Sequence, residues 1–72
     1  MKLKYYNDTD SLYIDLSSKT SVNSIEVAPG VVIDLDETNN IVGIDIDNAT
    51  RIIELNRLET ESLPIHEFLQ TV

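Results

Sequence analysis

The chain has 72 residues, a formal net charge of −8 and no cysteine. A chain of this length allows one small domain with a modest core, and without cysteine it has no disulfide, no thiolate metal site and no cysteine nucleophile. Thirteen Asp and Glu against five Lys and Arg repel phosphate groups, so we expect no nucleic-acid partner.

Apolar and polar side chains alternate along residues 12–16, 31–36 and 42–47. Residues 2–6 and 24–27 repeat this alternation more weakly. A period of two predicts β-strands that each bury one face. The segments between these strands are too short for crossover helices, so neighbours in sequence are expected to pair as antiparallel hairpins.

Turn-forming residues separate the expected strands. Residues 17–21 form a polar loop, the Pro29-Gly30 pair is typical of a type II turn, and Asn39-Asn40 tolerates the left-handed region of a tight loop. The sequence therefore predicts a five-strand antiparallel β-meander over residues 1–47.

The pattern becomes helical after residue 47. Asn48 is a suitable N-cap for a helix over residues 49–59. A second short helix is predicted near the C-terminus by apolar residues spaced i, i+3, i+4 and i+7, namely Ile65, Phe68, Leu69 and Val72. The expected fold class is α+β, a single domain over residues 1–72. One or two C-terminal α-helices from the segment 48–72 are expected to pack on one face of the meander.

Three of the expected strands carry an aspartate beside a core isoleucine. The isoleucines at positions 14, 33 and 44 are expected to point into the core. Their neighbours Asp15, Asp34 and Asp45 then lie exposed on the opposite side of the sheet. Solvated carboxylates titrate near their normal values and lack the burial that acid–base catalysis requires. We therefore expect no enzyme and no catalytic residue.

The acidic turn at residues 34–40, from Asp34 to Asn40, is rich in oxygen ligands of the kind that calcium prefers. Its start resembles an EF-hand loop, but Asn39 stands where that loop requires glycine, and no glutamate follows at the twelfth position. We predict no dedicated metal site and no cofactor. Binding of a small ligand or a divalent cation by this turn remains an alternative function.

Aromatic and apolar residues suggest interaction surfaces. Tyr5 is expected in the core, whereas Tyr6 and Tyr13 emerge on the outer face, where tyrosine is a frequent interface residue. The C-terminal stripe is more apolar than a chain end requires, so its burial against a second subunit predicts a homodimer. The candidate interface residues are Tyr6, Tyr13, Ile65, Phe68, Leu69 and Val72.

A longer pattern runs through the first fifty residues. It comprises Tyr5 and Asp8, Asp-Ser-Leu-Tyr-Ile at 10–14, Glu-Val-Ala-Pro-Gly-Val-Val-Ile-Asp at 26–34, Asn-Ile-Val-Gly-Ile-Asp-Ile at 40–46 and Asn-Ala at 48–49. This pattern resembles the domain of unknown function 2283 family of short bacterial and archaeal proteins. One departure is Asn39, where such proteins often carry glycine. The resemblance implies an α+β fold and no established activity, cofactor or catalytic residue.

Some members of that family are encoded beside small toxin-like proteins, which implies an antitoxin-like role. An acidic surface is complementary to a basic partner protein. The first residues lack the long apolar region of a secretory signal, and no apolar run approaches the length of a membrane span. We therefore expect a cytoplasmic protein that acts by protein–protein interaction, most concretely as an antitoxin-like inhibitor of a basic partner.

Overall fold

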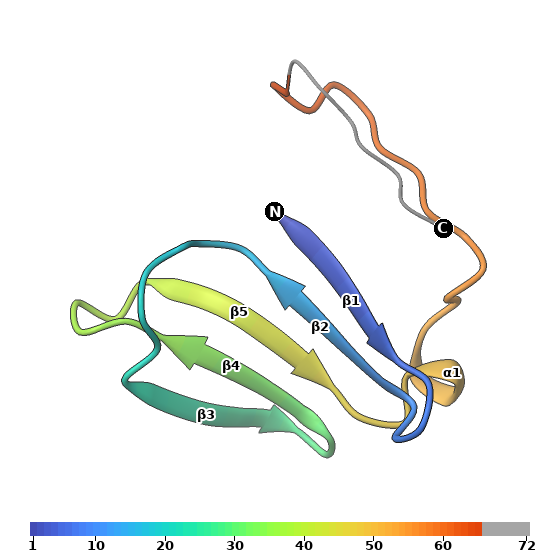
Figure 1. Cartoon of the computed structure of the whole chain (residues 1–72), viewed down its shortest axis with the longest axis horizontal. Helices are drawn as coiled ribbons and strands as arrows, with labels where there is room; N and C mark the ends of the chain where they lie inside the picture. The colour runs from blue at the N-terminus through green and yellow to red at the C-terminus, as the bar shows by residue number, and fades with distance from the viewer. Residues whose placement is uncertain (66–72) are drawn as a thin grey trace.

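The computed structural model describes residues 1–65, which form a five-stranded antiparallel sheet followed by one short helix (Figure 1). The α+β class and the antiparallel sheet are thus confirmed. The strands are β1 (Lys2–Tyr6), β2 (Ser11–Asp15), β3 (Asn23–Ala28), β4 (Val31–Leu35) and β5 (Ile41–Ile46), and the helix is α1 (Ala49–Ile52).

The strand order is β1-β2-β5-β4-β3, so the predicted meander is wrong at one connection. β2 pairs with β5 and not with β3. Residues 16–22 carry the chain past the ends of β5 and β4 to the far edge of the sheet (Figure 1). Seven extended residues span about 23 Å, which exceeds the roughly 14 Å across three strand spacings. The loop is therefore long enough to connect non-neighbouring strands without a helix.

Backbone hydrogen bonds anchor this connection at both ends. The amides of Leu16 and Ser17 donate to the carbonyl oxygen of Val42 at 2.8 and 3.1 Å. The amide of Val22 donates to the carbonyl oxygen of Leu35 at 2.9 Å. Because β2 pairs with β5, the apolar strand β5 lies in the centre of the sheet, between β2 and β4.

The strand register separates two chemically different faces. One face, which we call the apolar face, carries two rows of uncharged residues, Leu3, Ile14, Ile44, Ile33 and Ile25, and Tyr5, Leu12, Ile46, Val31 and Ala28. The other, the polar face, carries Lys2, Asp15, Gly43, Asp34 and Ser24, and Lys4, Tyr13, Asp45, Val32 and Glu26. The predicted facing of the three aspartates away from the isoleucines is confirmed.

The helix is much shorter than predicted, because α1 ends at Ile52 instead of continuing to residue 59. Its C-cap residue, Ile53, is already extended, with φ −131° and ψ 164°. β-Branched residues lower helix propensity, and so short a helix depends on packing for its stability. Of the second predicted helix, only Ile65 is described, and it is not helical. Phe68, Leu69 and Val72 lie outside the described residues.

Asp10, and not Asn48, caps the helix. Asn48 occupies the N-cap position with φ 53°, but its side chain makes no capping hydrogen bond. Instead the hydroxyl and backbone amide of Thr50 donate to the carboxylate of Asp10, at 2.7 and 3.2 Å. The hydroxyl of Tyr5 donates to the same carboxylate at 2.8 Å. Tyr5 was expected in the core, but its side chain is 43% exposed because its hydroxyl reaches out to Asp10.

The compact core occupies one corner of the apolar face. Leu12, Ile46 and Ala49 form a buried cluster, against which Ile53 and Leu55 pack from the segment that follows β5. The central isoleucines, expected in the core, are only half-buried, namely Ile14, Ile33 and Ile44. Leu35 and Val42, at the other end of the sheet, are also buried, at 9% and 5% exposure. The side chains of the apolar face that stay open are therefore those of its middle row and of the edge strands.

Candidate functional site: the two faces of the sheet

Tyr13 lies across the polar face above Gly43. A Cβ atom at Gly43 would overlap the Tyr13 hydroxyl, so glycine leaves the space that the ring occupies. The hydroxyl donates to Oδ2 of Asp34 at 3.0 Å, and the hydroxyl of Ser24 donates to Oδ1 of the same residue at 2.7 Å. These bonds connect β2, β4 and β3 across the sheet. Tyr13 is on the outer face, as predicted, but it is half-buried and serves as a cross-strand brace.

Burial and this hydrogen bond also set the acidity of Tyr13. Desolvation is the largest cause of its raised pKa, followed by the hydrogen bond to Asp34 and the negative charges nearby. The phenol therefore stays protonated at neutral pH and acts here as a hydrogen-bond donor.

The pKa of Asp45 is not the normal value that was expected for a solvated carboxylate. Its pKa is raised, mainly by desolvation and further by the negative charges of Asp47 and Asp34. Asp45 lies opposite Tyr13 on one side and Val32 on the other, so both of its cross-strand neighbours limit its access to water. Asp15, Asp34 and Asp45 are all half-buried and not fully exposed as predicted.

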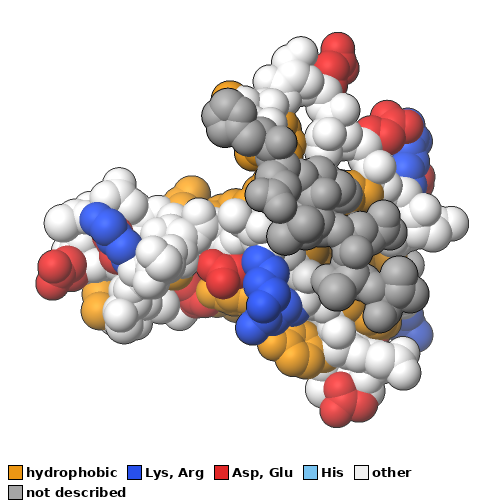
Figure 2. All heavy atoms as spheres, turned by 45° about the horizontal axis from the view of Figure 1, so that its top comes forward, with side chains coloured by type: hydrophobic (Ala, Val, Ile, Leu, Met, Phe, Trp, Pro, Cys, Tyr) orange, Lys and Arg blue, Asp and Glu red, His pale blue; other side chains and the backbone are white. Residues whose placement is uncertain are grey.

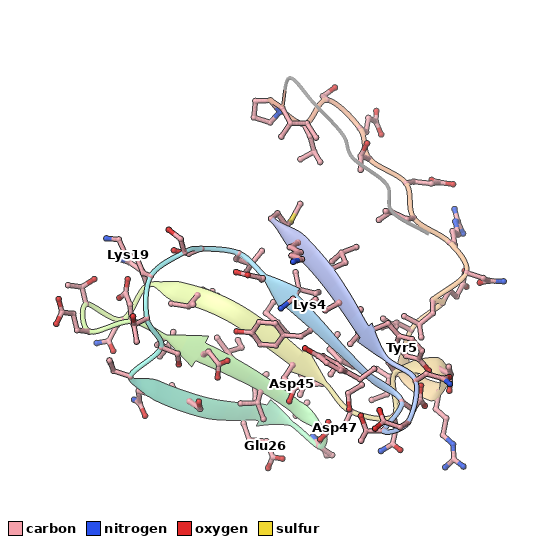
Figure 3. All side chains as sticks on the ribbon, in the orientation of Figure 1. Lys4, Tyr5, Lys19, Glu26, Asp45 and Asp47 are labelled. Carbon is pink, nitrogen blue, oxygen red and sulfur yellow. The ribbon has the colours of Figure 1, made fainter. Side chains whose placement is uncertain are left out.

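The polar face has an uneven charge distribution. Lys4 lies on the edge strand β1, whereas Asp45, Asp47 and Glu26 lie toward β5 and β3 (Figure 3). Glu26 is exposed, and Asp47, just beyond β5, is exposed and accepts a hydrogen bond from Ser11 at 3.3 Å. The acidic side of this face therefore presents solvent-accessible carboxylates to a ligand or a protein.

The acidic turn is closed by its own hydrogen bonds. Oδ1 of Asp36 accepts bonds from the Thr38 amide, the Thr38 hydroxyl and the Asn40 amide, each at 2.9 Å. The side chain of Asp36 is only 5% exposed. The Asn40 amide is the main cause of the lowered pKa of Asp36, and the Thr38 donors add to it. Asn39 adopts φ 65°, the left-handed conformation that glycine adopts without strain.

The two aspartates of this turn do not point to a common site. Asp34 is engaged by Tyr13 and Ser24 on the polar face, whereas Asp36 is buried within the turn. Within residues 1–65, no group of three or more His, Cys, Asp or Glu is arranged to hold a metal ion. The arrangement of Asp36 with Thr38 and Asn40 is a structural Asx-type turn.

The remaining candidate interface residues lie apart from this turn. Tyr6 is 47% exposed on the edge strand β1, and Ile65 is 51% exposed in the segment after α1. Figure 1 is viewed down the shortest axis, and there the described segment after α1 lies outside the outline of the sheet. In that view this segment, residues 56–65, does not overlap the sheet (Figure 1). The stripe that was predicted to form the dimer interface lies otherwise outside the described residues.

Large apolar side chains are exposed at both edges of the apolar face. Leu3 on β1 and Ile25 on β3 are each 47% exposed, and Val27, at the bulge in β3, is 54% exposed. Figure 2 shows hydrophobic side chains at several places on the surface of the molecule. The alternation along the sequence predicted that each strand buries one face, and it did not indicate that these edge-strand residues are exposed.

The family described as "Protein of unknown function (DUF2283)" matches residues 2–49 of the chain. The matched region runs from the start of β1 to the first residue of α1. No curated protein and no protein of solved structure matches. In the described part of the chain, no helix has the length and apolar character needed to cross a membrane.

Proposed function

The chain belongs to the DUF2283 family, and from its fold we propose that it acts by contact with other proteins and performs no catalysis of its own. The observation that supports this proposal is the separation of its two faces. One face carries uncharged side chains that are left partly open to water, and the other carries exposed carboxylates. Exposed apolar patches and complementary charge are both typical of interaction surfaces.

The polar face fits a basic partner. Glu26 and Asp47 are exposed, and the net charge of −8 places the whole chain in a field that attracts cations. We propose a cytoplasmic, antitoxin-like inhibitor that covers a small basic protein, such as a ribonuclease-type toxin. The charge attraction speeds encounter, and the fixed side chains of Tyr13 and Asp34 supply a rigid surface for docking.

A binding titration with small basic proteins of the ribonuclease-toxin type tests the proposal. We expect a 1:1 complex whose affinity falls when salt is raised, because salt screens the attraction between opposite charges. The complex should also suppress the activity of the basic protein. Absence of binding, or an affinity that salt leaves unchanged, would contradict the proposal.

Charge reversal at the polar face locates the contact. Glu26→Lys should weaken binding about tenfold at low salt, since it places repulsion where attraction was. Glu61→Lys changes the net charge equally, and residue 61 is exposed in the segment after α1. Equal weakening by both variants would show that only net charge matters and that the polar face is not the contact.

A further inference from the structure

We propose that the open apolar face is covered by a second copy of this chain, with two sheets packed face to face in a symmetric dimer. This inference goes beyond the proposed function, because it names a second partner, another copy of the chain, and the surface that this partner occupies.

The apolar face of the sheet lacks a complete second layer. A sheet with one apolar face needs a second layer, which is a helix or another sheet. Here α1 has four residues and reaches only the corner formed by Leu12, Ile46 and Ala49. The side chains at the middle of the same face, Ile14, Ile33 and Ile44, remain half-buried. Among the described residues, no large side chain is fully buried.

The described part of the chain, residues 1–65, does not supply the missing layer. The segment after α1 lies beside the sheet outline in the view down the shortest axis (Figure 1). Its larger apolar side chains are themselves exposed, Leu58 by 60% and Leu63 by 41%. The Cα radius of gyration is 13.1 Å, whereas a compact domain of this length has about 11 Å. This larger radius reflects the segment after α1, which extends away from the sheet (Figure 1).

The distribution of charged residues favours a second copy of this chain as the occupant of the apolar face. Both rows of the apolar face lack charged residues, and the carboxylates project from the polar face. When two copies stack through their apolar faces, their acidic faces point outward to solvent on opposite sides. A basic partner has no complementary charge to meet on the apolar face, but a second identical apolar face matches it residue for residue about a two-fold axis.

The area of the apolar face sets the size of the interface that two copies can form. Five strands spaced by about 4.8 Å, each with about five residues of about 3.3 Å, give a face of roughly 24 by 17 Å. Part of each face is already covered at the corner formed by Leu12, Ile46 and Ala49, so two faces offer at most roughly 800 Å² in flat projection, which falls in the size class of weak, transient interfaces. Met1 and Leu16, 80% and 37% exposed, extend the apolar surface at one end. Buried area does not fix affinity, but interfaces of this size class are weak, so we expect a dissociation constant in the micromolar range or above.

Sedimentation equilibrium of the full chain, from about 5 to about 500 µM, tests the proposal. We expect a monomer–dimer equilibrium that shifts toward dimer as salt is raised. The reason is that two chains of charge −8 repel each other, and salt screens this repulsion while it leaves apolar contact intact. A monomeric mass over the whole range would overturn the proposal.

Two adjacent residues of β3 provide a matched pair of variants. Ile25 faces the apolar side and Glu26 the polar side of the same edge strand. Ile25→Lys should weaken dimerisation at least tenfold, although it lowers the net negative charge and so reduces repulsion. Glu26→Lys should leave the dimer intact or strengthen it. Leu3→Lys, equally exposed at the opposite edge, should act like Ile25→Lys.

Alternative occupants give different results in the same experiment. A dimer that survives Ile25→Lys and Leu3→Lys but dissociates in a Phe68→Ser/Leu69→Ser variant has its interface in the C-terminal stripe and overturns the proposal. Circular dichroism confirms that each variant is folded, which is expected because Ile25 and Leu3 are already half-exposed.

The failure of this inference and that of the proposed function are distinguishable. A chain that stays monomeric yet binds a basic protein with salt-weakened affinity overturns the dimer and retains the proposed function. A chain that dimerises as expected but binds no basic protein retains the dimer and removes the inhibitor role.

Discussion

Gly43 and Tyr13 act as one unit, because the absent side chain of the glycine is what allows the tyrosine ring to cross the sheet. Gly43→Ala should therefore displace the ring and break its hydrogen bond to Asp34, at a cost of about 1–3 kcal/mol. In a Tyr13→Ala background the same change should be nearly neutral or stabilising, since no ring remains to be displaced and alanine suits a strand better than glycine.

A double-mutant cycle by urea denaturation measures this coupling. The cycle should return an interaction energy of about 1 kcal/mol or more between positions 13 and 43. Ser24→Ala provides the control, because it removes the other donor to Asp34 without touching the glycine. Additive effects of Gly43→Ala and Tyr13→Ala would show that the ring does not depend on the glycine.

Asp45 weakens the fold at neutral pH. Its folded pKa is raised, so the folded state binds the proton more tightly than the unfolded state does. Its contribution to stability is therefore most favourable when the pH is below the pKa of the unfolded state. This contribution is lost as the pH rises through the raised pKa of the folded state. Asp45→Asn should stabilise the protein by about 0.2–1 kcal/mol at pH 7. Urea denaturation of both proteins at pH 7 and near pH 3 checks this stabilisation. If Asp45→Asn stabilises the protein equally at low pH, the stabilisation does not come from removal of the desolvated charge.

At the scale of single elements, the short helix depends on a residue that is forty positions away in sequence. Asp10 accepts hydrogen bonds from Thr50 and Tyr5, and its pKa is lowered, first by the Thr50 hydroxyl and then by that of Tyr5. The stability from this carboxylate is present above its unfolded pKa and is lost as pH falls through the lowered folded value. The pKa of Asp36 is also lowered, mainly by the amide of Asn40, so its contribution to stability is likewise lost as pH falls.

Asp10→Asn and Asn48→Gly separate the two possible caps. Both positions have φ 53°, and asparagine and glycine both tolerate this conformation. We expect a clear drop in the thermal unfolding midpoint for Asp10→Asn and almost no change for Asn48→Gly. The opposite order would mean that Asn48 provides the cap after all.

Strand existence and facing could be predicted because both follow from alternation along each strand. The conformational preferences of turn residues located the positive φ angles at Gly30 and Asn39. The pairing of β2 with β5 could not be predicted, since alternation does not say which strand is the neighbour and the loop at 16–22 is long enough for either arrangement. The Asp10 cap was missed because its partners are close only after folding.

The brace on the polar face was also not predictable from spacing. Nothing in the sequence indicates that Tyr13 reaches over Gly43, because cross-strand neighbours depend on register and strand order. The exposure of Ile25 and Leu3 was missed for a different reason. An apolar side chain marks the face that needs cover, but it does not indicate whether the cover comes from the same chain.

For the whole molecule, substitutions in the two parts of the apolar face should behave differently. Leu12 and Ile46 are 8% and 9% exposed in the closed corner, so Leu12→Ala or Ile46→Ala should cost about 2–4 kcal/mol at any protein concentration. Ile33 is half-buried on the open part. Ile33→Ala should cost less when the protein is dilute and more when it is concentrated, because its side chain is fully covered only in the dimer.

Thermal unfolding of these variants at two protein concentrations measures the difference. The unfolding midpoint of the unaltered chain should itself rise with concentration. If Ile33→Ala is as costly as Leu12→Ala in dilute solution, then the open part of the face is covered within one chain.

The most direct test of a face-to-face dimer is an isotope-filtered NMR experiment on a mixture of labelled and unlabelled chains. We predict intermolecular nuclear Overhauser effects at the methyl groups of Ile25, Ile33 and Ile44, and none at Val32 on the polar face. Isoleucine methyl groups that show effects only within their own chain, at concentrations well above the expected dissociation constant, would contradict the account.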